Sequence, residues 1–150
     1  MKIAIGADHG GVELKDVVAE HLTERGFEFK DFGTFGKNAV DYPDIGQAVA
    51  EAVAAGEFDR GIVICGTGIG ISISANKVPG IRCALLSDVF SAKATRQHND
   101  ANMMAMGGRV MGPGLALELV DAFLDTEFSE GERHKKRIAK IAAIEKKYNK

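Results

Sequence analysis

The sequence contains few cysteines, and their placement limits the kinds of site that the protein can hold. Only Cys65 and Cys83 occur in 150 residues, and they lie in separate predicted strands without the Cys-x-x-Cys spacing of a zinc site. This pattern argues against a disulfide framework and against a structural zinc site. We therefore expect both residues to be free thiols.

Long apolar runs and a charge excess are also missing. No stretch approaches the ~18 consecutive apolar residues of a membrane span, and the apolar start at residues 1–6 is too short for a signal peptide. The 21 acidic and 19 basic residues give a formal net charge of −2, which points neither to nucleic acid nor to a membrane as a partner. We expect a cytoplasmic protein.

Short apolar runs alternate with amphipathic stretches along the chain. The apolar runs predict strands at Lys2–Ala7, Phe27–Phe32, Gly61–Cys65, Arg82–Leu86 and Met103–Met106. The amphipathic stretches predict helices at Gly11–Arg25, Asp44–Ala55, Ile69–Lys77, Ser91–Asn99 and Pro113–Leu124. Strands separated by helical crossovers indicate an α/β fold, a parallel sheet with helices on both faces. With no linker or repeat, residues 1–150 are expected to form a single domain.

Polar residues and glycines indicate where these helices begin and end. Asp44 is expected to cap the helix after Pro43, and Ser87 or Asp88 the helix that begins near Phe90. The glycines expected at helix ends are Gly26, Gly56 and Gly80. The long loop Phe32–Pro43 has no evident structural role, and such loops often carry function.

Residues 130–150 predict one more, amphipathic helix beyond the sheet. Its apolar side carries Ile138, Ile141, Ile144 or Ala142, and Tyr148, whereas five lysines lie elsewhere on it. Such a helix can pack on its own domain or reach across to another subunit, and the pattern leaves both arrangements open.

A thiol stands at the end of the third predicted strand, where a glycine-rich turn begins. The segment reads Cys65-Gly66-Thr67-Gly68-Ile69-Gly70. Open α/β sheets bind ligands at the carboxyl ends of their strands, and successive N–H groups in a glycine turn can converge on negative charge. Such donors favour a thiolate, which can act as a nucleophile or as a base. The competing interpretation is an ordinary small buried cysteine.

Neither glycine turn fits a known nucleotide-binding motif. After Gly6, Val12 stands where a phosphate-binding loop needs lysine, and the Gly66 turn has Ile71 at the last dinucleotide position. Both ATP and NAD are therefore disfavoured. A thiol-dependent phosphatase is disfavoured too, because it would need an arginine shortly after the cysteine and residues 66–76 contain none.

Three further groups could contribute to a site. Asp8 and His9 follow the first strand and should emerge at the same sheet edge as Cys65, so that the two turns can face one cleft. The alternative is that Asp8 caps the next helix and His9 is a solvent-facing turn residue. The polar stretch 97–102, with His98, ends the fourth helix, where a simple helix cap is the alternative. Arg133 and Arg137 share a helix face and could bind a phosphate, and Arg109 would join them if the strand ends converge. The simpler explanation for the two helix arginines is a charge run that is exposed to solvent.

Taken together, several motifs resemble those of the B-type ribose-5-phosphate isomerases, in the right order and over almost the whole chain. They are Asp8-His9-Gly10-Gly11, Asp41-Tyr42-Pro43, the run 61–72 through the Cys65 turn, Asn76-Lys77, Arg96 to Asn102, and Gly131-Glu132-Arg133-His134. In one departure, Glu132 stands where the family commonly has a second glycine.

The resemblance implies a Rossmann-like three-layer sandwich and a cofactor-free, metal-free aldose–ketose isomerase acting on ribose 5-phosphate and ribulose 5-phosphate in the pentose phosphate pathway. It also implies a homodimer, or a pair of dimers, with sites shared between subunits. Cys65 would be the base and Thr67, with the backbone of Gly66, Gly68, Ile69 and Gly70, would hold the enediolate. Asp8 and His98 would open the sugar ring. The implied sugar contacts are Tyr42 and Asn99, and the implied phosphate contacts are His9, Arg109, Arg133, His134 and Arg137.

Two other functions remain open at this point. Within the family, allose 6-phosphate or galactose 6-phosphate is the alternative substrate, although galactose-specific subunits tend to lack the stretch that contains His98. Outside it, the alternative is a non-catalytic sugar-phosphate-binding protein. Such a protein would need neither Cys65 nor His98, and both are present.

Overall fold

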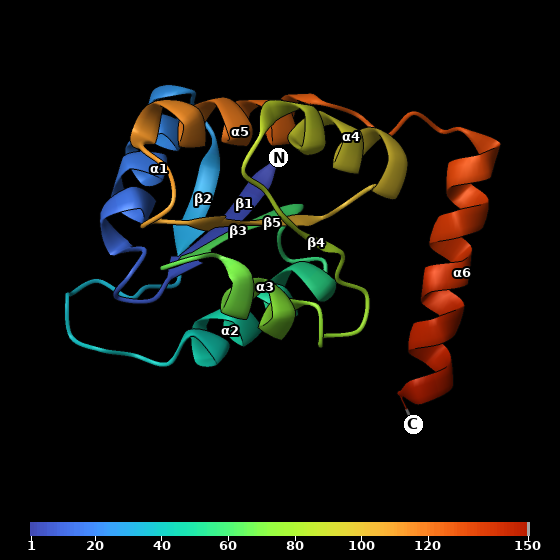
Figure 1. The fold of residues 1–150 in the computed structure, drawn as a ribbon, viewed down its shortest axis with the longest axis horizontal. Coiled ribbons are helices and arrows are strands. Elements are labelled where there is room, and N and C mark those ends of the chain that lie inside the picture. Colours follow the sequence, from blue (N-terminus) through green and yellow to red (C-terminus); the bar gives the residue numbers. More distant parts are fainter. Residues whose placement is uncertain (150) are drawn as a thin grey trace.

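Five parallel strands form the centre of the structure, a computed structural model that describes residues 1–149 (Figure 1). The strands are β1 (Lys2–Ala7), β2 (Glu28–Asp31), β3 (Arg60–Cys65), β4 (Cys83–Leu85) and β5 (Met103–Gly107). Their order across the sheet is β2-β1-β3-β5-β4, and every pairing between neighbours is parallel. The predicted parallel sheet is confirmed.

Helices cover both faces of this sheet and complete three layers (Figure 1). One face packs against α1 (Val12–Glu24), α4 (Val89–Asn99) and α5 (Pro113–Asp125), and the other against α2 (Tyr42–Ala54) and α3 (Ile69–Ala75). The last helix, α6 (Glu132–Tyr148), stands at the side of the molecule away from α1 and α2 (Figure 1). None of the helices in residues 1–149 is both long enough and apolar enough to cross a membrane.

The alternation of side chains along the strands explains why both faces are covered. Ile3 and Ile5 point into the core beneath α1 and α5, whereas Ala4 between them points into the core beneath α2 and α3. The central strands β3 and β5 are buried on both faces in the same way. They therefore appear in the sequence as continuous apolar runs.

The chain changes direction across the sheet between β1 and β3. From β1 it first adds β2 on one side, and then crosses to add β3 on the other. In open α/β sheets, ligands bind outside the carboxyl ends of the strands at such a point. Asp8 directly follows β1 and Cys65 ends β3, so the topology places both residues at this edge of the sheet.

The predicted helix ends are confirmed in part. Asp88 caps α4, because its carboxylate accepts the N–H of Ser91 at 2.8 Å. The expectation for Asp44 is wrong, since α2 begins earlier, with Asp41 in the N-cap position. Pro43 is tolerated in the first turn, where N–H groups have no partner within the helix. The three glycines expected at helix ends, Gly26, Gly56 and Gly80, have φ angles of 75°, 78° and 89°.

The apolar stripe predicted on the C-terminal helix is largely uncovered. Ile141, Ile144 and Tyr148 on α6 are 46%, 61% and 73% exposed. A hydrogen bond from Gly80 N–H to Glu145 Oε1, 3.0 Å long, joins α6 to the loop before β4. Lys150, which the predicted helix included, lies outside the described residues.

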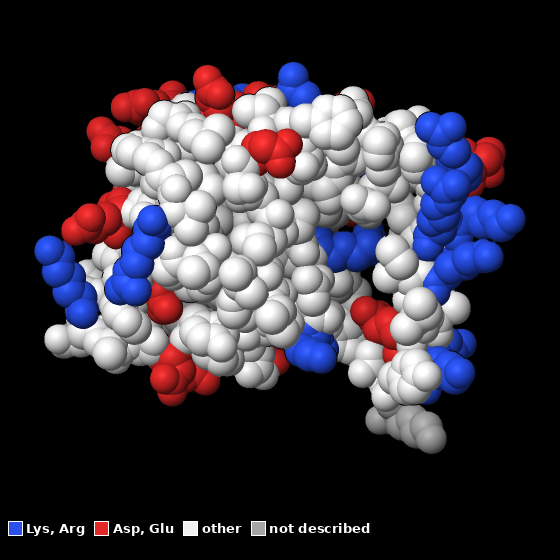
Figure 2. Space-filling view, in the orientation of Figure 1, with Lys and Arg blue, Asp and Glu red and all other residues white. Residues whose placement is uncertain are grey.

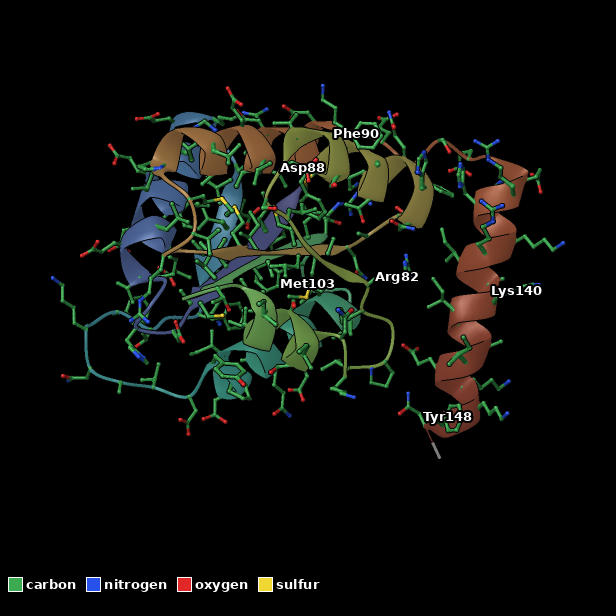
Figure 3. All side chains as sticks on the ribbon, viewed as in Figure 1. Arg82, Asp88, Phe90, Met103, Lys140 and Tyr148 are labelled. Carbon is green, nitrogen blue, oxygen red and sulfur yellow. The ribbon has the colours of Figure 1, made fainter. Side chains whose placement is uncertain are left out.

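Replacing Phe123 by alanine should strongly destabilise the fold. Phe123 on α5 is fully buried in the core, and Phe→Ala changes in cores cost about 3–5 kcal/mol. The matched control is Phe90→Ala, because Phe90 lies on the outer surface of α4 and is 79% exposed (Figure 3). That change should stay within about 0.5 kcal/mol. Urea unfolding followed by circular dichroism measures both, and equal losses would contradict the packing described.

Candidate active site

The turn after β3 holds the Cys65 thiol in a buried position. Cys65 is 4% exposed, and the N–H of Gly68 donates a hydrogen bond to its Sγ at 3.1 Å. Gly68 has a φ of 79°, and a Cβ on it would come within 2.7 Å of the Met106 carbonyl carbon. Only glycine fits there without strain, so the tight turn that aims this N–H at the sulfur depends on it.

The turn after β1 meets the Cys65 turn, as the sequence predicts. Asp8 is buried, and its carboxylate Oδ1 accepts the N–H of Gly10 at 2.9 Å. A Cβ on Gly10 would lie 3.0 Å from the backbone nitrogen of Gly66, so the two turns touch through their main chains. Asp8 and Cys65 therefore lie in neighbouring segments at this edge of the sheet.

The turn after β5 completes this edge of the sheet. Gly108 N–H donates to the carbonyl of Cys65 at 2.8 Å, and Arg109 N–H donates to the carbonyl of Gly66 at 2.9 Å. The Arg109 side chain lies over Gly66, because a Cβ added there would be 3.4 Å from its Nη1. A guanidinium therefore stands beside the thiol turn.

Two more predicted residues, His9 in the turn after β1 and Tyr42 at the start of α2, lie near this edge of the sheet. His9 is exposed, and its Nδ1 accepts the N–H of Val40 at 3.2 Å. The Tyr42 ring packs against Gly70 so closely that a Cβ on this glycine would lie 2.5 Å from ring atoms. The structure thus gathers one group of predicted site residues at the carboxyl edge of the sheet: Asp8, His9, Tyr42, Cys65 to Gly70, and Arg109.

A second group forms where α4 ends and α6 begins. The rings of His98 and His134 stack with centroids 4.5 Å apart and planes 12° apart. The Nε of Arg133 lies 3.4 Å from the Nε2 of His134. Arg137 follows one helical turn later on α6. Imidazoles and guanidiniums therefore gather at one place, an arrangement suited to an anion such as a phosphate.

Two arginines hold the backbone of the turn that carries His98. Arg96 is 3% exposed and donates through Nη1 to Asp100 Oδ1 at 2.8 Å and to the Ala101 carbonyl at 2.7 Å. Arg82, which precedes β4 (Figure 3), donates through Nε to the Asn99 carbonyl at 2.9 Å. The places of His98 and Asn99 are thus fixed from both sides.

The electrostatics of the second group favour a neutral His134. Burial lowers the pKa of this histidine, and the positive charges of His98, Arg133 and Arg137 lower it further. An imidazolium ion would stand among like charges there, and a bound anion would relieve that repulsion.

The two groups lie at opposite edges of the sheet within one chain. α4 returns the chain to the amino ends of the strands, where the carbonyl of Asn102 accepts the N–H of Gly61 at the start of β3. Figure 1 shows α6 on that side, away from the turns after β1 and β3. Within one chain, then, Arg109 does not lie beside Arg133 and Arg137, because it follows β5 at the carboxyl edge of the sheet and α6 lies on the other side. Among residues 1–149, no cluster of three or more His, Cys, Asp or Glu side chains is placed to hold a metal ion.

The sequence as a whole matches one protein family. The family model described as Ribose/Galactose Isomerase covers residues 3–141. The chain belongs to this family.

Individual relatives agree with that assignment. Ribose-5-phosphate isomerase B of Escherichia coli (strain K12) is 51% identical over 99% of this chain and 99% of its own length. The solved structure of Clostridium thermocellum ribose-5-phosphate isomerase B covers 99% of this chain and 100% of its own, with 59% identity and a TM-score of 0.97. Galactose-6-phosphate isomerase subunit LacB of Clostridium acetobutylicum is 42% identical over 94% of this chain and 82% of its own. The protein is therefore an enzyme, an aldose–ketose isomerase with the Rossmann-like fold.

Sequence reasoning missed one buried charge beside the site of this isomerase. Lys15 is 1% exposed and forms an ion pair with Asp31, Nζ to Oδ2 2.6 Å. A signal was present, because Lys15, Val18 and Leu22 follow one another at helical spacing and Val18 and Leu22 belong to the core. A lysine on the buried face of a helix is rare enough to mark a position for study.

Removing the charge of Arg137 should raise the pKa of His134. Arg137→Gln removes one of the positive charges that lower it, so protonation becomes easier. The control is Lys140→Gln, a charge loss one turn further along α6 (Figure 3). Titration of the ring protons by NMR measures both. The same His134 pKa in the wild type and in Arg137→Gln would contradict the placement of Arg137 close to His134.

Proposed function

We propose that this isomerase interconverts ribose 5-phosphate and ribulose 5-phosphate, with Cys65 as the base that moves the proton. The observation that carries the proposal is the buried thiol at the carboxyl end of β3, where three backbone turns meet. The match to ribose-5-phosphate isomerase B relatives along the whole chain supports the choice of substrate.

The chemistry proposed for Cys65 is a proton shift between neighbouring carbons. As a thiolate, it takes the proton from C2 of open-chain ribose 5-phosphate, and the electron pair moves to give an enediolate with its charge on the C1 oxygen. The thiol then returns a proton to C1, while the C2 hydroxyl loses its own proton to the C1 oxygen and becomes the ketone. No oxidant or metal is required, because the electrons stay within the sugar.

The turn supplies donors for the charge that develops on oxygen. The Thr67 hydroxyl accepts the N–H of Ile69 at 3.2 Å, so its own hydrogen remains to be donated. Thr67 is exposed on the side of the turn that faces away from the core. Together with the backbone N–H groups of residues 66–70, it would stabilise the enediolate only as it forms, which is what lowers a barrier.

Ring opening and phosphate binding are assigned to the remaining residues. Asp8, next to the thiol turn, and His98 form the acid–base pair that opens the furanose ring. Tyr42 and Asn99 contact the sugar hydroxyls. Guanidinium and imidazole side chains from both groups suit a doubly charged anion. Those that hold the phosphate are His9, Arg109, Arg133, His134 and Arg137.

Because the two groups lie at opposite edges of one chain, we propose that each site uses the first group of one subunit and the second group of another. Uncovered apolar side chains support such an assembly: Ile69 and Ile73 on α3 and Leu85 on β4 are 51%, 56% and 46% exposed. Figure 2 shows few charged residues over the middle of this face, whereas Lys and Arg gather along α6. The minimal assembly is a homodimer, and two such dimers can also pair.

A six-carbon substrate is the second candidate. The galactose-6-phosphate isomerase subunit among the relatives favours it, and allose 6-phosphate differs from ribose 5-phosphate by a single carbon along the chain. The presence of His98 for ring opening favours ribose 5-phosphate.

Replacing Cys65 by alanine should abolish turnover while leaving phosphate binding intact. A general base contributes about 10²–10⁴-fold to a rate, so kcat should fall by at least about that factor. The matched control is Cys83→Ala, because burial raises the pKa of the Cys83 thiol to about 12 and keeps it protonated. Turnover is measured without added metal, with ribose 5-phosphate, allose 6-phosphate and galactose 6-phosphate side by side. Substantial turnover by Cys65→Ala would contradict the assignment of Cys65 as the base. A wild-type preference for a six-carbon sugar phosphate would contradict ribose 5-phosphate as the main substrate.

Mixing two inactive variants should restore activity if the site is shared. In a dimer of one Cys65→Ala and one His98→Ala chain, one of the two sites keeps both residues. Random exchange of equal amounts therefore recovers about a quarter of wild-type activity. Mass spectrometry of the intact assemblies verifies that subunits have exchanged, and no recovery after exchange would argue that each chain builds its own site.

A further inference from the structure

Lys15 is a buried charge that no step described above uses. It lies in the first turns of α1, and its side chain is among the largest that are fully buried in the molecule. Its ammonium forms the 2.6 Å ion pair with Asp31, and the Phe35 ring lies 4.7 Å away, centroid to Nζ. Burying a lysine costs stability that an apolar residue of similar size would not cost. Its presence therefore calls for a reason other than packing.

The partner carboxylate connects this charge to the long loop after β2. One oxygen of Asp31, Oδ2, takes the Lys15 ammonium, and the other, Oδ1, accepts the N–H of Gly33 at 2.8 Å. The carbonyl of Gly33 in turn accepts the N–H of Ala7 at 2.6 Å. Ala7 ends β1 and directly precedes Asp8. A chain of contacts thus runs from Lys15 on α1 through Asp31 and Gly33 to Ala7, the residue before Asp8.

The same loop continues to two residues assigned to substrate binding. Val40 near its end donates its N–H to His9, and the loop leads into α2, where Tyr42 packs on Gly70. At the start of the loop, Lys15 pairs with Asp31, and its ammonium lies 4.7 Å from the ring centroid of the loop residue Phe35. The loop is therefore fixed at both ends, by a buried ion pair at one and by site residues at the other.

We propose that Lys15 and Asp31 are positioning residues for substrate binding: their buried ion pair fixes loop 32–41 so that His9 and Tyr42 face the substrate. The inference rests on the proposed function, because His9 and Tyr42 matter only if a sugar phosphate binds there. Cys65 is held separately, by the N–H of Gly68 in its own turn. Loss of the pair should therefore weaken binding much more than it slows proton transfer.

The test compares steady-state kinetics of four variants with ribose 5-phosphate. Lys15→Met removes the ammonium at similar size, and Asp31→Asn removes the carboxylate charge while keeping an oxygen for the Gly33 N–H. Each should raise KM by about tenfold and change kcat by less than about threefold. Lys15→Arg keeps the charge and should recover most of the wild-type KM. Glu28→Gln is the matched control, since it also removes a carboxylate charge from β2 but breaks only an exposed ion pair with Lys2 on β1, 3.6 Å long. It should leave KM and kcat unchanged.

A double-mutant cycle separates positioning from a general loss of stability. If Lys15 acts through the loop contacts of His9 and Tyr42, Lys15→Met should raise KM by a clearly smaller factor in the His9→Ala background than in the wild type, because only the contribution through Tyr42 remains. A purely structural role would lower the melting temperature and leave KM unchanged in the folded enzyme. Should either single variant fail to fold, Lys15→Met/Asp31→Asn leaves no buried charge unpaired, because the other partner of Lys15, Asp16, is exposed, and it carries the same comparison.

Each outcome bears on a definite part of the proposal. Wild-type KM in folded Lys15→Met and Asp31→Asn enzymes, or effects of Lys15→Met and His9→Ala that simply multiply, would overturn the positioning role while the proposed function stands. A wild-type enzyme without turnover of ribose 5-phosphate would overturn both. A raised KM that Lys15→Arg reverses and that is smaller in the His9→Ala background would establish it.

Discussion

The close approach of three backbone turns at the carboxyl edge of the sheet is the constraint on which the rest of the site depends. Gly10 lies against Gly66, Gly108 donates to the Cys65 carbonyl, and a Cβ on Gly108 would lie 2.6 Å from the carbonyl oxygen of Gly10. Side chains at these positions would push the turns apart. Main-chain contact therefore brings residues from β1, β3 and β5 around one thiol and leaves it buried below N–H donors.

Much of the fold could be predicted from the sequence, because the strongest patterns are local. Apolar runs buried on both faces, such as β3 and β5, and the amphipathic stretches between them gave the strands, the helices and their parallel arrangement. The sequence predicts that α2 starts at Asp44, but the helix begins at Tyr42. Pro43 is compatible with both starts, because proline fits the first turn of a helix as well as the position before it. Capping of α4 by Asp88 follows from its short acidic side chain before an apolar run.

The candidate site was predictable only where topology decides it. Parallel strands end at the same edge, so Asp8 and Cys65 had to be neighbours. The stacking of His98 on His134 depends on how α6 leaves the body after α5, and no periodicity carries that information. The Lys15–Asp31 pair joins residues sixteen positions apart through tertiary packing, although the place of Lys15 on the inner face of α1 was visible in the spacing. Which residues share a site thus depends on packing between elements and, in the assembly proposed for the two groups, on packing between chains.

Deuterium incorporation during turnover tests the proton-transfer role of the thiol most directly. Ribose 5-phosphate is isomerised in D₂O, and the hydrogen at C1 of the ribulose 5-phosphate product is read by NMR. A thiolate base that takes the C2 proton exchanges it with solvent before returning it, so deuterium should appear at C1. Product that carries only the substrate's own hydrogen at C1, under conditions of full conversion, would show that the hydrogen moves from C2 to C1 without exchange and would contradict a solvent-exchanging base at Cys65.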